Sequence, residues 1–385
     1  MVIAVLGGGQ LARMLVLAGT PLGLRFRCLD PAADAVAGHV SELLIAPYDD
    51  PAALQRLAHG AEVVTFEFEN VPAATTERLL QHAPVRPHPR ALATGQDRLL
   101  EKQLFARLGM GVPEYRTAGT LTELRAAVAA VGAPCIVKTR RLGYDGRGQA
   151  RLQPGPELDA AIVRAHAELT HGNDGGLIVE RFVPFQRELS VLAVRSLHGE
   201  IAVYPLVENV HEAGILRRSR APAPDLPPAL VRSATAFVTA VLQDLDYTGV
   251  LAIELFDLGG TLLANEMAPR VHNSGHWSID GAVTSQFELH VRAVSGLPLG
   301  STAPQGVSLM VNVIGTLPDA ARVASVEGAH VHLYDKEPRA GRKIGHVTLN
   351  APDASTLAAR VPALASAMAF EAAEAGEVDR VLRHW

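Results

Sequence analysis

Cysteine, lysine and long hydrophobic runs are all scarce in this chain, and each shortage excludes a class of protein. Only Cys28 and Cys135 occur among the 385 residues, far apart and each within a predicted strand. Two isolated thiols exclude a disulfide-stapled secreted scaffold and are typical of buried cysteines in a cytosolic protein. No apolar run is long enough to span a membrane, and the first residues lack the basic segment of a signal peptide. We therefore expect a cytoplasmic protein with no membrane partner.

The charge balance excludes a further class. The formal net charge is −5, so there is no overall basic surface for nucleic acid and we expect no such partner. Lysine is rare: of the 35 lysines and arginines, only Lys102, Lys138, Lys336 and Lys343 are lysines. Because arginine occupies most of the positively charged positions, each remaining lysine weakly indicates a site that needs a compact ammonium group.

The remaining composition is that of a globular α/β protein with two or three domains. Hydrophobic residues make up 48% of the chain and charged residues 19%, which excludes a disordered chain. A strand at 2–6, a glycine-rich turn at 7–9, a helix at 11–18 and a strand at 24–29 are typical of a nucleotide-binding α/β unit. Ala12 stands where a dinucleotide fingerprint has its third glycine. The turn is therefore predicted either to bind another anion through its N–H groups or only to reverse the chain tightly.

Further strands and helices follow, and one strand end carries acidic residues. A strand at 62–66 runs into the segment 67–72, so Glu67 and Asn70 are candidates for substrate contact; a solvated helix start is the alternative. Prolines at 84–89 mark a domain boundary. The patterns then predict helices at 97–108, 121–131, 157–169, 229–245 and 285–294, strands at 135–138, 177–183, 188–194, 201–207, 250–256 and 261–264, and a small α/β end piece from about residue 307.

A glycine-rich loop follows the strand at 135–138, which ends in Lys138. Residues 143–149 contain three glycines, which permit the close backbone approach and positive φ that a phosphate-covering flap needs. A lysine at the strand end can reach phosphate oxygens. The alternative is a flexible hairpin without a ligand.

The most informative stretch is residues 265–277, which follow a short apolar strand. The segment holds Glu266, Arg270, two histidines, two asparagines and a serine, and it is too polar for a buried strand or a helix stripe. We predict a strand end that runs into a loop over a cleft. Glu254 lies within the preceding strand, so two strands are expected to bring carboxylates to one end as a site for Mg²⁺. The loop would supply positive and hydrogen-bonding groups for an anionic substrate.

In this order the motifs resemble the ATP-grasp superfamily over nearly the whole chain, and within it the family of ATP-dependent N5-carboxyaminoimidazole ribonucleotide synthetases. The resembling segments are 7–11, 66–72, 143–149, 265–277, 334–337 and 341–346, and 265–277 and 336–346 are the most specific. Ala12, where that family often has glycine, is a minor departure. The resemblance implies an α/β ATP-grasp fold: a Rossmann-like N-terminal domain at 1–95, an ATP-grasp domain at 96–300 with its lid at about 115–185, and a small C-terminal α/β domain at 301–385.

The resemblance also implies roles for the matching residues. ATP would be bound by Arg98, Lys138, Gly143, Tyr144, Asp145, Gly146, Arg147, Gly148, Gln149, Glu180, Arg181, Phe182, Val183, Glu188, His211, Asn265 and Glu266. Mg²⁺ would be held by Glu254 and Glu266. The ribonucleotide would be surrounded by Gln10, Leu11, Glu67, Asp145, Ser274, Lys336, Arg342 and Lys343. The catalytic residues would be Asp145, Arg270, His272 and Asn273: Arg270, His272 and Asn273 would face bicarbonate, and Asp145 would orient the 5-amine of the ribonucleotide.

The implied reaction joins bicarbonate to 5-aminoimidazole ribonucleotide with ATP, through carboxyphosphate, and yields N5-carboxyaminoimidazole ribonucleotide, ADP and phosphate in purine biosynthesis. The residue types suit it, because bicarbonate is a poor nucleophile and needs a cationic clamp beside a polyanionic nucleotide. The resemblance further implies a homodimer.

Three other hypotheses for the function are alternatives to the ribonucleotide synthetase. A formate-using glycinamide ribonucleotide transformylase is expected to lack the loop 270–277 as written here. A biotin carboxylase-like enzyme would have a longer chain. A non-catalytic nucleotide sensor would have lost Lys138, Glu254 or Glu266, and all three are present.

Overall fold

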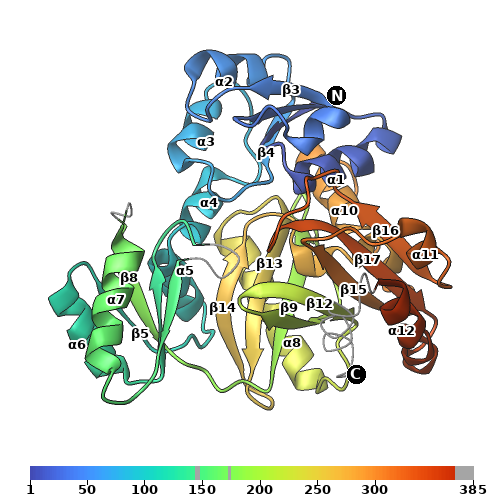
Figure 1. Cartoon of the computed structure of the whole chain (residues 1–385). Coiled ribbons are helices and arrows are strands. Elements are labelled where there is room, and N and C mark those ends of the chain that lie inside the picture. The colour runs from blue at the N-terminus through green and yellow to red at the C-terminus, as the bar shows by residue number, and fades with distance from the viewer. Residues whose placement is uncertain (144–147, 172–174, 369–385) are drawn as a thin grey trace.

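The computed structural model describes residues 1–143, 148–171 and 175–368, organised around three β-sheets. Figure 1 shows the N-terminal sheet at the top, the lid at the lower left, the central sheet in the middle and the C-terminal strands on the right. Tyr144, Asp145, Gly146 and Arg147 of the predicted flap lie outside the described residues. Within those residues, no helix has the length and apolar character needed to cross a membrane.

The N-terminal sheet is parallel, with the strand order β3-β2-β1-β4. Strand β1 is buried along nearly its whole length, as a parallel sheet covered by helices requires. Gly7 has a φ of +103°, which lets the chain turn sharply from β1 into α1. The elements are β1 (Val2–Leu6), α1 (Gln10–Gly19), η1 (Thr20–Leu22), β2 (Arg25–Asp30), η2 (Val36–His39), β3 (Glu42–Ile45), α2 (Pro51–Ala58), β4 (Val63–Phe66), α3 (Ala73–Leu79) and α4 (Pro89–Gly95).

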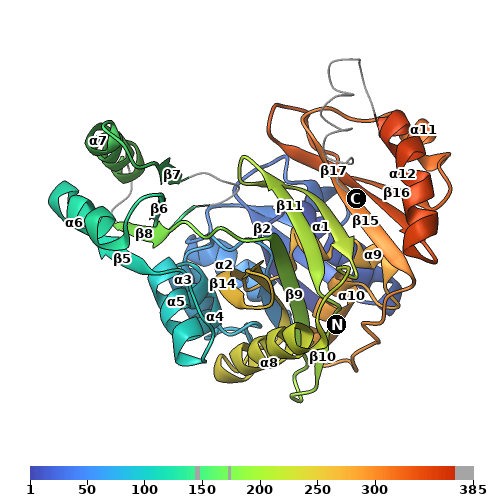
Figure 2. The ribbon, with the colours of Figure 1, turned by 90° about the horizontal axis from the view of Figure 1, so that it is seen from below.

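The lid is a small antiparallel sheet with the order β5-β8-β6-β7. Its first helix begins with a reciprocal capping box between Thr120 and Glu123. Figure 2 shows the lid projecting to one side of the central sheet. Its elements are β5 (Tyr115–Ala118), α6 (Leu121–Val131), β6 (Cys135–Thr139), β7 (Gln149–Leu152), α7 (Leu158–Thr170) and β8 (Leu177–Arg181).

The central sheet is antiparallel and has nine strands in the order β14-β13-β9-β11-β12-β15-β17-β16, with β10 beside β9. Strand β9 alternates between two cores: Leu189 and Val191 face one, and Leu192 faces the other. The strands are β9 (Arg187–Arg195), β10 (Ile201–Val203), β11 (Val207–Glu212), β12 (Ile215–Ala221), β13 (Gly249–Asp257), β14 (Leu262–Ala268), β15 (Val307–Ile314), β16 (Ala329–Leu333) and β17 (Lys343–Ala351). The helices are α5 (Arg98–Arg107), α8 (Pro228–Asp244), η3 (Asn273–Gly275), α9 (Ser278–Gly281), α10 (Gln286–Ser295), α11 (Ala320–Ala324) and α12 (Ala354–Met368).

One sequence-based expectation differs from the structure: the strand predicted at 201–207 divides into β10 and the start of β11. The strand predicted at 261–264 continues through Asn265–Ala268 as β14 before the chain enters the loop, because the antiparallel partner β13 satisfies its backbone. The strands of the end piece from about residue 307 extend the central sheet, because β15 pairs with β12.

Helix α10 joins the N-terminal sheet to the central sheet. Phe287 and Val291 of α10 pack in one continuous core with Leu15 of α1 and Leu192 of β9. The helix therefore lies between the two sheets and fixes their relative position through buried apolar area.

His290 of α10 adds a buried polar link to this junction. Its Nδ1 accepts a hydrogen bond from the Val250 N–H of β13 at 3.1 Å, and its Nε2 lies 2.9 Å from the Thr65 hydroxyl of β4. Because a backbone N–H can only donate, Nδ1 is unprotonated and Nε2–H donates to Thr65. Burial lowers the pKa of His290 from 6.5 to about 4, so the neutral ring holds the junction together.

We predict that this junction weakens in mild acid. Below pH 6.5 His290 becomes protonated in the unfolded chain, whereas in the folded chain it stays neutral down to about pH 4. The stability that the neutral ring contributes is therefore fully present above pH 6.5 and is lost as the pH falls from 6.5 to 4. Between pH 7 and pH 5 the expected loss is about 2 kcal/mol. Urea unfolding at both pH values, compared with His290→Gln, measures it. If the His290→Gln variant lost as much stability between pH 7 and pH 5 as the wild type does, this result would contradict the role of His290.

Candidate active site

One cleft of about 1270 Å³ is lined by the N-terminal sheet, the lid, the central sheet and the C-terminal strands. Most of the residues that the sequence singles out meet there. They are Gln10, Leu11, Glu67, Arg98, Lys138, Gly143, Gln149, Glu180, Arg181, Phe182, Val183, Glu188, His211, Glu254, Asn265, Glu266, Arg270, His272, Asn273, Lys336, Arg342 and Lys343. Gly148 and Ser274 are described but do not line the cleft, and residues 144–147 lie outside the described part of the chain.

Two carboxylates face each other across the hairpin of β13 and β14. Glu254 and Glu266 are direct cross-strand partners, so their proximity comes from antiparallel register and not from two strand ends at one edge. Burial raises the pKa of Glu254, His211 opposes this, and the negative charges of Glu266 and Glu188 add to it. Burial acts the same way on Glu266, but Arg98 and Lys138 outweigh it and lower its pKa.

The cationic wall of the cleft is held by acidic partners. Arg98 Nη1 lies 2.8 Å from Glu266 Oε2, and Lys138 Nζ lies 2.9 Å from Glu180 Oε2. Burial would raise the pKa of Glu180, but the charges of Lys102, Lys138 and Arg98 hold it at about 2. This part of the cleft can therefore present positive charge to an anionic ligand.

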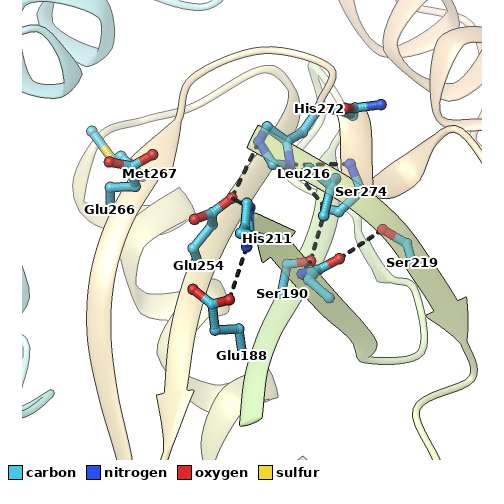
Figure 3. A network of polar contacts seen from close by, with 12 residues as sticks. Glu188, Ser190, His211, Leu216, Ser219, Glu254, Glu266, Met267, His272 and Ser274 are labelled. Carbon is cyan, nitrogen blue, oxygen red and sulfur yellow. Dashed lines mark hydrogen bonds and ion pairs between the residues drawn. The ribbon is translucent and has the colours of Figure 1, made fainter. Parts of the chain in front are cut away.

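Two histidines that differ in charge, one cationic and one neutral, flank Glu254 (Figure 3). His211 Nδ1 lies 2.9 Å from Glu188, and the hydrogen bond to Glu188 and the charge of Glu254 outweigh burial and raise the pKa of His211 to about 9. His272 Nε2 lies 3.5 Å from Glu254, yet burial and the charge of Arg270 lower its pKa to about 3. His211 is therefore a cation and His272 a neutral ring at neutral pH.

A chain of buried side chains orients His272. Ser219 donates to Asn209 at 2.7 Å, Asn209 donates to Ser190 at 2.8 Å, and Ser190 donates to Ser274 at 2.7 Å. The Ser274 hydroxyl lies 2.8 Å from His272 Nδ1, and the Ser274 backbone N–H also donates to Nδ1 at 3.3 Å. Because that N–H can only donate, Nδ1 is the acceptor and the proton sits on Nε2, facing Glu254. Ser274, which the sequence predicted to bind substrate, is completely buried. It lies behind His272 and supports the ring of that residue.

The predicted anion-binding turn is already bonded to carboxylates. Gly8 N–H donates to Asp30 at 2.8 Å and Gly9 N–H donates to Glu67 at 2.9 Å. Burial raises the pKa of Glu67, although the Gly9 N–H and Arg270 oppose the rise. The turn therefore bonds to Asp30 and Glu67 with these two groups, and the side chain of Gln10 instead accepts a 2.5 Å hydrogen bond from Lys336.

The predicted bicarbonate residues are anchored from two sides. Arg270 Nη2 lies 2.7 Å from Glu69 of the N-terminal part. Asn273 exchanges two side-chain hydrogen bonds with Asn312 of β15, at 3.0 and 2.7 Å. Because β15 belongs to the C-terminal strands, the loop after β14 is held by contacts distant in sequence.

An apolar wall and several polar groups of the cleft were not assigned to the site from the sequence. Phe185 and Phe256 stack with ring centroids 4.8 Å apart and planes at 5°. Both line the cleft beside Phe182, as do Asp30, Tyr48, Gln96, Glu101 and Tyr334. The rings could stack on a planar base. No local pattern marks them, because Phe256 reads as an ordinary core residue of its strand.

Three family models match successive parts of the chain. A ribonucleotide synthetase preATP-grasp domain matches residues 1–96, an ATP-grasp domain matches residues 103–287, and the C-terminal domain of phosphoribosylaminoimidazole carboxylase matches residues 308–360.

Curated relatives and solved structures agree with these matches. The N5-carboxyaminoimidazole ribonucleotide synthase of Pseudomonas aeruginosa is 49% identical over 94% of this chain and 98% of its own, and that of Brucella melitensis is 46% identical over 90% and 95%. The synthetase structure from Thermus thermophilus has a TM-score of 0.88 at 49% identity, covering 97% of this chain and 99% of its own. The Aspergillus clavatus synthase, in complex with ADP and 5-aminoimidazole ribonucleotide, has a TM-score of 0.86 at 30% identity, covering 95% and 98%.

We predict that His272 is neutral and protonated on Nε2 near neutral pH, because Nδ1 accepts from Ser274. Long-range proton–nitrogen NMR correlations of ¹⁵N-histidine-labelled protein report the tautomer, and His272→Gln identifies the signal. A ring protonated on Nδ1, or an imidazolium at pH 7, would show that the hydrogen-bond chain does not set its state.

Proposed function

The chain belongs to the family of N5-carboxyaminoimidazole ribonucleotide synthases, and from this premise we propose which of its residues carry the reaction. It is an ATP-grasp ligase that uses ATP to carboxylate 5-aminoimidazole ribonucleotide in purine biosynthesis. The observation that carries the residue assignments is that the nucleotide-type and ribonucleotide-type residues line one cleft.

ATP binds on the side of the cleft formed by the lid and the central sheet. Lys138 and Arg98 contact its phosphates, because both cations point into the cleft beside acidic partners. The backbone of Glu180–Val183 and the stacked Phe185 and Phe256 receive the adenine. Glu188 and His211 take the ribose and the adjoining phosphate.

Glu254 and Glu266 fit a magnesium ion that is shared with ATP. Among the described residues, no group of three or more His, Cys, Asp and Glu side chains could hold a metal alone. A pair of facing carboxylates suits Mg²⁺, which completes its shell with substrate phosphates and water. Burial, together with the negative charges of Glu266 and Glu188, raises the pKa of Glu254, and a bound cation would stabilise the ionised carboxylate against both. When bound, the ion neutralises charge on the β- and γ-phosphates.

The ribonucleotide binds on the N-terminal and C-terminal side of the cleft. Lys336, Arg342 and Lys343 surround its 5′-phosphate, and the Lys336–Gln10 hydrogen bond places one ammonium beside the glycine-rich turn. Leu11 and Glu67 line the same part of the cleft.

Carboxylation proceeds where the two sides meet. A bicarbonate oxygen attacks the γ-phosphorus, ADP leaves, and carboxyphosphate forms. Arg270, neutral His272 and Asn273 align the bicarbonate, since a cation and two hydrogen-bonding groups match its charge. Carboxyphosphate releases CO₂ and phosphate, and the 5-amine of the ribonucleotide attacks the carbon of CO₂ and loses a proton to the released phosphate. Asp145, which lies outside the described residues, is assigned to orient that amine.

The proposal also includes the assembly and the location of the enzyme. The family resemblance implies a homodimer, and a biosynthetic ligase of small metabolites fits the cytoplasm. Sedimentation of the purified protein measures the first of these directly.

ADP release tests the reaction itself. We expect rapid release only with ATP, bicarbonate and 5-aminoimidazole ribonucleotide together, because bicarbonate accepts the γ-phosphoryl group and the ribonucleotide consumes the carboxyphosphate. Omitting either partner of ATP should lower the rate at least tenfold. Release supported equally by formate and glycinamide ribonucleotide would favour the transformylase and contradict the proposal.

Replacing Lys343 separates the two substrate sites. We predict that Lys343→Ala raises the KM for the ribonucleotide by about 10- to 100-fold, because a charge-assisted phosphate contact contributes about 1.5–3 kcal/mol. The KM for ATP should change less than twofold.

Arg322→Ala is the matched control. Arg322 is a cation of the same C-terminal region that hydrogen-bonds Ser366 and does not line the cleft, so both KM values should stay unchanged. If Lys343→Ala instead raised the KM for ATP and left the KM for the ribonucleotide unaltered, Lys343 would bind ATP and its assignment to the ribonucleotide would be wrong.

A further inference from the structure

Lys102 is the one lysine of the chain that none of the site motifs contains. It lies on α5, is completely buried, and does not line the cleft. Its Nζ lies 3.1 Å from Glu180 Oε1 and donates to the Asn265 carbonyl at 3.3 Å. Because Lys102 does not line the cleft, any effect of Lys102 on the reaction is exerted through the residues around it, which include Glu180, Asn265 and Lys138.

Glu180 is shared by two lysines. Oε1 faces Lys102 at 3.1 Å, and Oε2 faces Lys138 at 2.9 Å. Burial and the charge of Lys138 lower the pKa of Lys102, while the ionised Glu180 opposes this. Lys102, Lys138 and Arg98 together oppose the single carboxylate of Glu180, so a net positive charge remains at Lys138, which faces the cleft. Without Lys102, Glu180 would neutralise a larger share of the charge of Lys138.

We propose that Lys102 is a positioning residue for ATP, which offsets part of the negative charge of Glu180 so that Lys138 keeps its charge for the nucleotide phosphates. The inference rests on the proposed function, since it takes ATP as the ligand of Lys138. The charge of Lys102 acts over a short distance in a buried setting, where screening by water is weak.

Neighbouring contacts of α5 place Lys102 for this role. Glu101 accepts a hydrogen bond from the Met267 N–H at 2.5 Å, while Lys102 bonds the Asn265 carbonyl of the same strand, β14. Asp97, before the first residue of α5, pairs with Arg140 of the lid at 2.6 Å. Helix α5 therefore contacts both the lid and the central sheet. The charge of Lys102 on the buried face of this helix can position the ammonium group of Lys138, which lies between them.

Lys102→Met tests the proposal, because methionine keeps the length of the side chain and removes its charge. We expect the Kd for ATP, measured by calorimetry, to rise at least tenfold, while the Kd for adenosine changes less than twofold. Adenosine lacks phosphates, so it reports the shape of the base pocket without the charge effect. Equal weakening for both ligands would mean that Lys102 only supports the fold and would overturn the proposal, as would an unchanged Kd for ATP.

Arg107→Met is the matched control, since it removes a cation from the same helix. Arg107 pairs with Asp244 on the surface and does not line the cleft, so neither Kd should change. Wild-type protein that failed to bind ATP would contradict the proposed function itself, whereas normal wild-type binding with an unaffected Lys102→Met variant would contradict only this inference.

A comparison within the Glu180→Gln background gives a second test that does not need the single variant Lys102→Met to fold. Once Glu180 is neutral, there is no charge for Lys102 to offset. Adding Lys102→Met to Glu180→Gln should therefore change the Kd for ATP less than threefold. A tenfold loss in that background would show that Lys102 acts independently of Glu180 and would overturn the proposal.

Discussion

The ionised carboxylate of Glu180 is the charge on which the arrangement of lid, helix and sheet depends. It lies on β8 of the lid, and its two oxygens face Lys102 of α5 and Lys138 of β6. A buried carboxylate is costly unless it is paired, so α5 must pack where its lysine reaches the lid. The same lysine and Glu101 bond β14. One buried charge thus sets how closely the lid approaches the strand that carries Glu266.

Charge balance also explains why neighbouring histidines differ around Glu254. His211 is hydrogen-bonded to Glu188 and near Glu254, so it is held as a cation. His272 is bonded through Nδ1 to neutral serine groups and lies near Arg270, so it stays neutral. The difference depends on partners from β9, β11 and the loop after β14, which come together only in the antiparallel sheet. The result is one charged and one neutral donor on either side of a carboxylate.

The elements that the sequence predicted well are those with strong local signals. The pattern of residues 121–131 matches α6 to the residue, and the predicted helix at 97–108 contains α5. Prediction was incomplete where polar residues form strands, because most of β11 and the whole of β12 were not predicted. Glu208 of β11 and Arg218 and Arg220 of β12 line a pocket on the molecule. Such strands lack the apolar alternation that marks a half-buried sheet.

The sequence by itself determined the α/β class, the residue types of the cleft and the resemblance to ATP-grasp ligases, because motifs such as 265–277 are contiguous and chemically unusual. Tertiary structure alone decided that Glu254 and Glu266 are cross-strand partners and that the C-terminal strands extend the central sheet. It also decided that Ser274 supports His272 and that Lys102 shares Glu180 with Lys138. Each of these depends on register, burial or the pairing of residues far apart in the chain, which no local pattern encodes.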